Sequence, residues 1–144
     1  MLRDLKNSLA VVHLLDAQSE TAATVKPALL DTKGFEGAGI LINFGAYTIG
    51  TGSGVSWKLR EGDTTADSGL SDVAAADYIG TLTGFADNTG DQMSVFVAYK
   101  GSKRYVTADI VVSANSTSQL MSVDGILSSA RVNPPTAPAA VART

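Results

Sequence analysis

Alternating apolar and polar positions are the strongest pattern along the chain, and they predict β-strands. In residues 39–48, Ile40, Ile42 and Phe44 fall on one face at a period of two residues, as in a half-buried strand. Residues 55–60 alternate more clearly, because polar residues separate three apolar ones. Together with residues 93–99, these segments define the expected core, which contains Ile40, Ile42, Phe44, Val55, Trp57, Leu59, Val95 and Val97.

Two further segments, residues 93–99 and 104–114, also alternate and are joined by four residues with turn chemistry. We therefore expect a β-hairpin over residues 93–114. Weaker strand patterns occupy residues 9–15, 21–25, 80–83 and 119–127; the first also fits a helical stripe, but its valines favour an extended chain. Residues 72–78 are expected to form one or two helical turns with Asp72 as the N-cap.

The spacing of these strands predicts the fold class. Short strands recur roughly every 8–12 residues with Gly, Asp and Asn turns between them, as in sandwiches and jelly rolls. We predict a mainly β protein, an antiparallel, jelly-roll-like β-sandwich with extended N- and C-terminal segments. The predicted divisions are an N-terminal arm (residues 1–8), the sandwich (9–132) and a tail rich in Pro and Ala (133–144).

The tail holds three of the four prolines in the chain. A proline-rich segment cannot pair as a central strand, so we expect it to be polyproline-like or disordered and to add no ladder hydrogen bonds to the domain. Two interpretations remain for it: a frayed end, or an arm that docks on a neighbouring subunit.

Composition excludes several classes of function. The 144 residues suit one domain, and 11 basic against 14 acidic residues give a net charge of −3, which disfavours binding to nucleic acid. The chain lacks cysteine, so disulfides, thiol nucleophiles and cysteine-ligated zinc are excluded. Apolar runs fall far short of the ~20 residues that span a membrane. We expect no enzyme activity, cofactor, metal site or membrane partner.

Weak chemical motifs remain. His13 is the only histidine, and we interpret it as partly buried or interfacial, since no triad partner is evident nearby. The glycine-rich residues 50–54 lack the P-loop ending and precede a strand, so they indicate a loop between strands.

Residues 61–91 hold seven acids and no Lys or Arg. Two parts of this stretch, 61–67 and 87–91, lack the regular calcium-loop spacing, which favours an acidic edge that meets a basic partner.

Lys100, Lys103 and Arg104 form a basic cluster, which is either a solvated turn or a contact for the acidic loops of a neighbour.

Two alternative functions depend on aromatic and acidic side chains. Aromatic residues could line a sugar-binding face in a carbohydrate-binding module, although Trp57 alternates with core positions. Those aromatic residues are Trp57, Tyr47, Tyr78, Tyr99 and Tyr105. A hydrolase using Asp63 and Asp67 is the remaining alternative.

Five blocks, in order and spanning nearly the whole chain, carry a family resemblance. They are residues 3–12 (RDLKNSLAVV), 31–38 (DTKGFEGA), 57–63 with 72–80 (WKLREGD and DVAAADYIG), 99–106 (YKGSKRYV) and 130–134 (ARVNP). The pattern resembles capsid decoration (cement) or minor head proteins of tailed bacteriophages.

The resemblance implies a structural virion protein. Such a protein is made in the host cytoplasm, binds the exterior of the capsid, bridges subunits of the major capsid protein and forms a homo-oligomer. We expect the chain ends and the basic cluster to form its interface, which comprises Arg3, Asp4, Lys6, Lys100, Lys103, Arg104, Pro134, Pro135 and Pro138.

Overall fold

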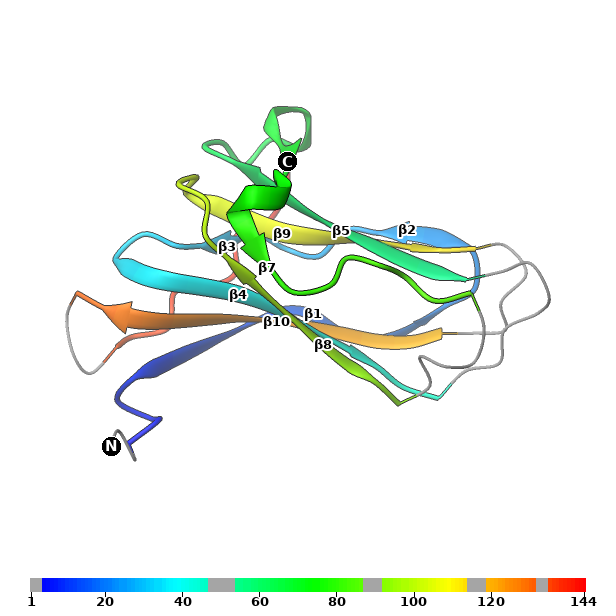
Figure 1. Cartoon of the computed structure of the whole chain (residues 1–144), viewed down its shortest axis with the longest axis horizontal. Helices are drawn as coiled ribbons and strands as arrows, with labels where there is room; N and C mark the ends of the chain where they lie inside the picture. Colours follow the sequence, from blue (N-terminus) through cyan, green and yellow to red (C-terminus); the bar gives the residue numbers. More distant parts are fainter. Residues whose placement is uncertain (1–3, 47–53, 87–91, 114–118, 132–134) are drawn as a thin grey trace.

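Two antiparallel β-sheets pack face to face (Figure 1). The computed structural model describes residues 4–46, 54–86, 92–113, 119–131 and 135–144. The first sheet contains, in spatial order, β1 (Leu9–Glu20), β10 (Gln119–Ala130), β4 (Phe35–Phe44), β8 (Ser94–Tyr99) and β7 (Tyr78–Ile79). The second contains β2 (Ala23–Val25), β9 (Tyr105–Val112), β5 (Val55–Gly62) and β6 (Ser71–Asp72), and β3 (Leu30–Asp31) also pairs with β9. The predicted mainly β sandwich is confirmed; its jelly-roll connectivity stays a prediction.

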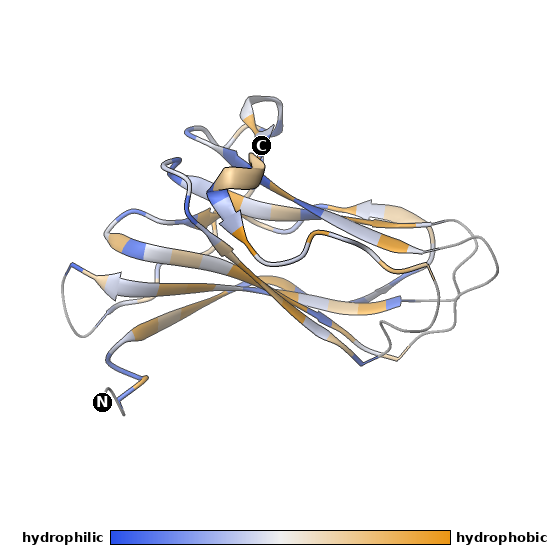
Figure 2. Ribbon diagram, in the orientation of Figure 1, coloured by the Kyte–Doolittle hydropathy of each residue, from blue (hydrophilic) through white to orange (hydrophobic). Residues whose placement is uncertain are grey.

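The core lies between the inner faces of the two sheets. Hydrophobic residues run along the strands of both sheets (Figure 2). Seven of the eight predicted core residues are buried, and the eighth, Val95, is partly buried against the same cluster. Trp57 is 5% exposed, packs against the rings of Phe44 and Phe85, and donates from Nε1 to the Thr81 carbonyl at 3.1 Å. The period of two therefore identified the buried side of each strand correctly.

The hairpin expected over residues 93–114 is wrong. β8 pairs with β4 and β7 in the first sheet, whereas β9 pairs with β2, β3 and β5 in the second. The chain crosses between the sheets at residues 100–104, so the two strands face one another across the core. The Tyr99 hydroxyl marks this corner, because it donates to the Glu61 carboxylate and accepts from the Lys103 amide.

Smaller expectations also need correction. Residues 80–83 are not a strand; the local strand is β7, just before them. Asp72 is not an N-cap, since it lies in β6 and pairs with Lys58 and Arg60. The only helical part of residues 72–78 is a single 3-10 turn, η2 (Ala75–Asp77). Another such turn, η1 (Asp67–Gly69), lies before β6. The extended interpretation of residues 9–15 is confirmed by β1.

The C-terminal residues contradict the expectation of a tail without ladder bonds. Leu29 and Val141 form an antiparallel bridge with main-chain hydrogen bonds of 2.7 and 3.0 Å. We call residues 135–144 the final segment. Its end lies above the second sheet, whereas the chain just before β1 lies below the first (Figure 1). Pairing is available because the prolines precede Val141 and leave its amide free to donate.

A candidate protein-binding face

Hydrophobic residues line up across the outer face of the first sheet. The strand registers place one residue from each strand in a single row, and we call this row the outer band. Because paired residues in antiparallel strands point to the same side, the whole row faces away from the core. Val11 and Ile79 at its ends are 59% and 62% exposed. The outer band consists of Val11, Ile126, Gly39, Ala98 and Ile79.

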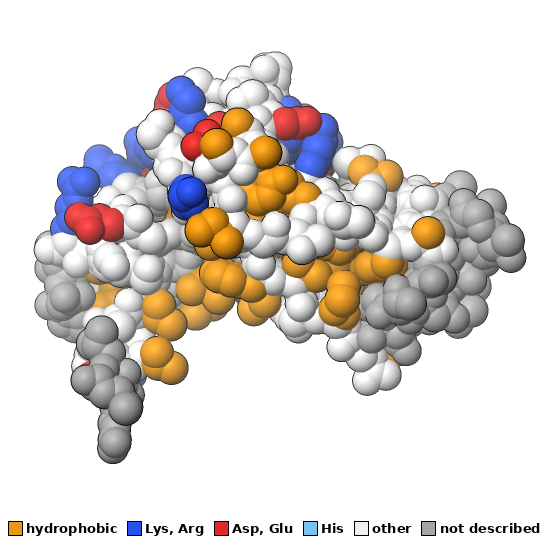
Figure 3. Space-filling view, in the orientation of Figure 1, with side chains coloured by type: hydrophobic (Ala, Val, Ile, Leu, Met, Phe, Trp, Pro, Cys, Tyr) orange, Lys and Arg blue, Asp and Glu red, His pale blue; other side chains and the backbone are white. Residues whose placement is uncertain are grey.

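A shallow apolar groove adjoins the centre of the outer band. Leu41 and Phe96 are paired in the next row, and Phe96 is 48% exposed. A side chain on Gly39 would place its Cβ 2.5 Å from the Phe96 ring, so the ring in this position leaves room only for glycine at residue 39. The groove has a volume of about 630 Å³, and its lining includes Ile126 and Ala98. Figure 3 shows hydrophobic side chains gathered across the region of β7 and β8.

A chain of polar side chains borders the apolar residues. His13 Nδ1 lies 2.7 Å from Asp124 Oδ1 on the neighbouring strand. Further along the face, the Ser94 hydroxyl donates to Asn43 Oδ1 at 2.8 Å, and Asn43 Nδ2 lies 3.4 Å from the Ser122 hydroxyl. The face thus combines an apolar centre with an ordered polar border, as protein-binding surfaces commonly do.

His13 is exposed at this border, with 52% of its side chain accessible, so it is not the partly buried residue that was expected, and its interfacial role stays a prediction. Its Nε2 also lies 3.0 Å from Asp16 Oδ1. The hydrogen bond to Asp124 raises the pKa of His13 above its usual value; burial opposes this effect, and Asp16 adds a smaller increase. The imidazole is therefore held toward its charged form between two carboxylates.

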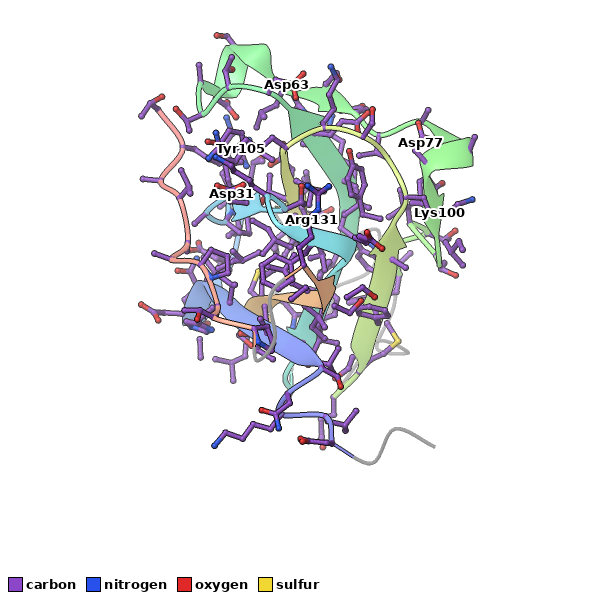
Figure 4. The ribbon with its side chains drawn as sticks, turned by 90° about the vertical axis from the view of Figure 1, so that its left-hand side faces the viewer. Asp31, Asp63, Asp77, Lys100, Tyr105 and Arg131 are labelled. Atoms are coloured by element: carbon purple, nitrogen blue, oxygen red, sulfur yellow. The ribbon has the colours of Figure 1, made fainter. Side chains whose placement is uncertain are left out.

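The basic cluster lies at the corner between the sheets and pairs within the chain. Lys103 Nζ contacts Asp63 at 2.6 Å, and Arg104 Nη2 contacts Asp31 at 2.7 Å. These carboxylates keep pKa values below their usual range because of the hydrogen bonds from their basic partners. Lys100 donates from its amide to the Asp77 carbonyl, and Figure 4 shows these two residues side by side, with Asp31 next to Tyr105.

The remaining predicted interface residues lie at the chain ends. Asp4 and Lys6 are exposed in a turn before β1, where the Ser8 hydroxyl donates to the Asp4 carbonyl at 2.8 Å. Pro135 and Pro138 are partly buried in the final segment. Arg3 and Pro134 lie outside the described residues. The structure thus brings Lys103 and Arg104 together, and it separates them from the turn at Asp4.

The acidic stretch finds basic partners within its own chain. Asp67 pairs with Lys26 and Arg143, and the hydrogen bond from Lys26, followed by that from Arg143, lowers the pKa of Asp67 to about 2. Among the described residues, no group of three or more His, Asp or Glu side chains is placed to hold a metal ion. Residues 87–91, the second acidic part that was compared with calcium loops, and most of the glycine loop at 50–54 lie outside the described part.

Aromatic residues are not displayed as a sugar-binding face. Trp57, Tyr99 and Tyr105 are buried, and Tyr78 is partly buried. Tyr47 lies outside the described residues. Phe96, which the alternating pattern placed in a strand but did not single out, is the aromatic side chain that the outer face exposes. Phe96 alternates with the core-facing Val95 and Val97 in one strand, and this alternation is the signal that could have identified it as outward-facing.

Comparisons with known proteins add a structural similarity. No protein-family model matches the chain, and no curated protein matches its sequence. A solved structure titled "Crystal structure of SPBc2 prophage-derived protein YomS" is similar to it, with 10% sequence identity and a TM-score of 0.44. The alignment covers 84% of this chain and 95% of that chain. In the described part of this chain, no helix has the length and apolar character needed to cross a membrane.

Proposed function

We propose that this protein is a structural virion protein that binds the exterior of a phage capsid through the outer face of the first sheet. The outer band carries the proposal, because four of its five strands contribute hydrophobic residues in one register on the outer side of the sheet, and Val11 and Ile79 at its two ends are exposed. Monomeric proteins rarely expose contiguous apolar surface unless it contacts a partner. The sequence resemblance to decoration and minor head proteins supplies the kind of partner, a major capsid protein.

The size of the face suits a protein partner. Four strands spaced by about 4.8 Å, with about six residues of each strand at 3.4 Å, span roughly 400 Å² before side-chain relief is counted, and the two-residue β7 adds little to this area. A standard interface buries about 800 Å² per partner. Many copies on a repeating shell add their contacts, so modest affinity per copy is sufficient to stabilise the shell. In this proposal the protein has no enzymatic activity and needs no cofactor.

Two matched valines test this proposal. Val11 lies in the outer band, and Val111, which is 40% exposed, lies on the outer side of β9 in the second sheet. We expect Val11→Lys to weaken co-sedimentation with capsids at least tenfold and Val111→Lys to change it less than twofold. Both variants should unfold like the original protein, because both side chains are solvent-exposed. Equal binding by both variants would contradict the assignment of the face.

A further inference from the structure

The final segment packs against the outer side of the second sheet. Besides the bridge between Leu29 and Val141, the Thr144 amide donates to the Thr65 carbonyl at 3.0 Å. The Asp67 amide in turn donates to the Thr144 carbonyl at 2.8 Å. Val141 packs against a separate hydrophobic cluster formed by Leu29, Leu70 and Tyr105. We call the surface formed by Leu29, Thr65, Asp67, Leu70, Tyr105 and Asp109 the tail groove.

Arg143 anchors the final segment in the tail groove. Its side chain is 7% exposed, and its two terminal nitrogens contact Asp109 and Asp67. Asp109 is itself 3% exposed in the middle of β9, where it also accepts from Arg60 at 3.3 Å. Burial lowers the pKa of Arg143, but the hydrogen bonds to the two carboxylates outweigh this effect. Two acids thus form a specific pocket for one guanidinium.

The tail groove has the features of a peptide-binding site. Its residues come from three separate regions of the chain, and even Asp109 is 34 positions from Arg143. Main-chain hydrogen bonds hold the peptide while side-chain pockets select Val141 and Arg143, as in recognition by strand addition. The final segment therefore occupies the groove by contacts that do not depend on its covalent connection to β10.

We propose that the tail groove is a binding site for an extended Val-x-Arg peptide, and that it accepts the final segment of a second copy of this chain. A tethered segment competes at an effective concentration of the order of millimolar, so the segment binds its own groove in dilute solution. Exchange between chains competes with this internal docking when copies of the protein are held at a local concentration of the same order. Prolines in the segment limit the entropy that is lost when it docks elsewhere. Exchange of identical segments links copies without any new contact.

Cysteine trapping tests the exchange, because the chain has no native cysteine. The hydroxyls of Thr65 and Thr144 lie 3.4 Å apart, which suits a disulfide. One full-length chain carries Thr65→Cys and a mass tag, and the other carries Thr144→Cys. We expect the two to form a disulfide heterodimer at about 1 mM each, at least fivefold above the yield at about 10 µM.

Three companion chains make the result decisive. A chain with both Thr65→Cys and Thr144→Cys should close an internal disulfide, which checks the docked geometry. Thr136→Cys places the thiol in the same segment but eight residues before Thr144, and it should give only background crosslinking with Thr65→Cys. Adding Arg143→Ala to the Thr144→Cys chain should reduce heterodimer at least fivefold.

Two results would overturn the inference. Heterodimer no higher than with Thr136→Cys, alongside a closed internal disulfide, excludes exchange, and failure of the internal disulfide excludes the docked geometry itself. Neither result affects the proposed capsid-binding face, because the tail groove lies on the opposite side of the sandwich. The two proposals therefore fail or succeed separately.

Discussion

The guanidinium of Arg143 donates a 2.5 Å hydrogen bond to Asp109, a carboxylate in the middle of β9 that is almost fully buried. Asp109 therefore depends on a residue near the end of the chain for part of its charge compensation. A buried carboxylate that loses a partner retains its cost of desolvation, so this contact links the final segment to the stability of the second sheet.

Replacing Arg143 should therefore destabilise the fold. We expect Arg143→Ala to lower the free energy of unfolding by about 2–4 kcal/mol, somewhat less than the loss of a sole partner because Arg60 remains beside Asp109. Urea unfolding followed by circular dichroism measures the change. Arg131→Ala is the matched control, since Arg131 is exposed and should cost less than about 0.5 kcal/mol. Equal stability of the two variants would show that the final segment is not docked.

Trp57 should be among the most costly core residues to truncate. We expect Trp57→Ala to cost about 3–5 kcal/mol, because the ring packs in the core against both Phe44 and Phe85. Trp57→Phe keeps an aromatic ring but loses the hydrogen bond to the Thr81 carbonyl, so it should cost less than the alanine variant. Denaturant titration distinguishes them. A loss below about 1 kcal/mol for Trp57→Ala would place the indole at the surface and restore the sugar-binding alternative.

The single histidine gives a direct test of the polar border. Because its folded pKa is raised, His13 contributes stability fully below its unfolded pKa of about 6.5, and this contribution is lost as pH rises through the folded pKa. The contribution should stay below about 1 kcal/mol, since the side chain is half-exposed. An NMR titration of the His13 ring should show a midpoint above 6.5, and Asp124→Asn should lower it. If Asp124→Asn left the midpoint unchanged, His13 and Asp124 would not be in contact.

The Tyr99 hydroxyl should stabilise the corner between the sheets. It donates to Glu61 of β5 and accepts from the Lys103 amide at 2.9 Å, so one group joins both sheets and the crossing chain. Burial, and then the hydrogen bond to Glu61, raise the pKa of Tyr99 above its usual range. We expect Tyr99→Phe to cost about 1–2 kcal/mol by thermal unfolding. Tyr78→Phe on neighbouring β7 serves as the control; if it costs as much, the corner contact contributes nothing specific.

Period-two alternation determined which side of each strand is buried. Ile40, Ile42 and Phe44 lie in the core because successive side chains in a strand point to opposite faces whatever strand lies beside them. The same local rule placed Trp57 inside and the mainly β class followed from it. Such information needs only a few consecutive residues, so it is present in the sequence without any long-range contact.

Tertiary structure alone decided which strands are neighbours and in what register. Strands that face each other across a sandwich carry the same alternation as strands in a hairpin, so the pattern could not assign β8 and β9 to different sheets. The outer band exists because Val11, Ile126 and Gly39 align in register across β1, β10 and β4. Likewise, Arg143 meets Asp109 only in the folded chain, whereas proline content by itself predicted a segment without ladder hydrogen bonds, either frayed or docked on a neighbouring subunit. The physical reason is that alternation specifies a buried side, whereas partners depend on packing between residues far apart in the chain.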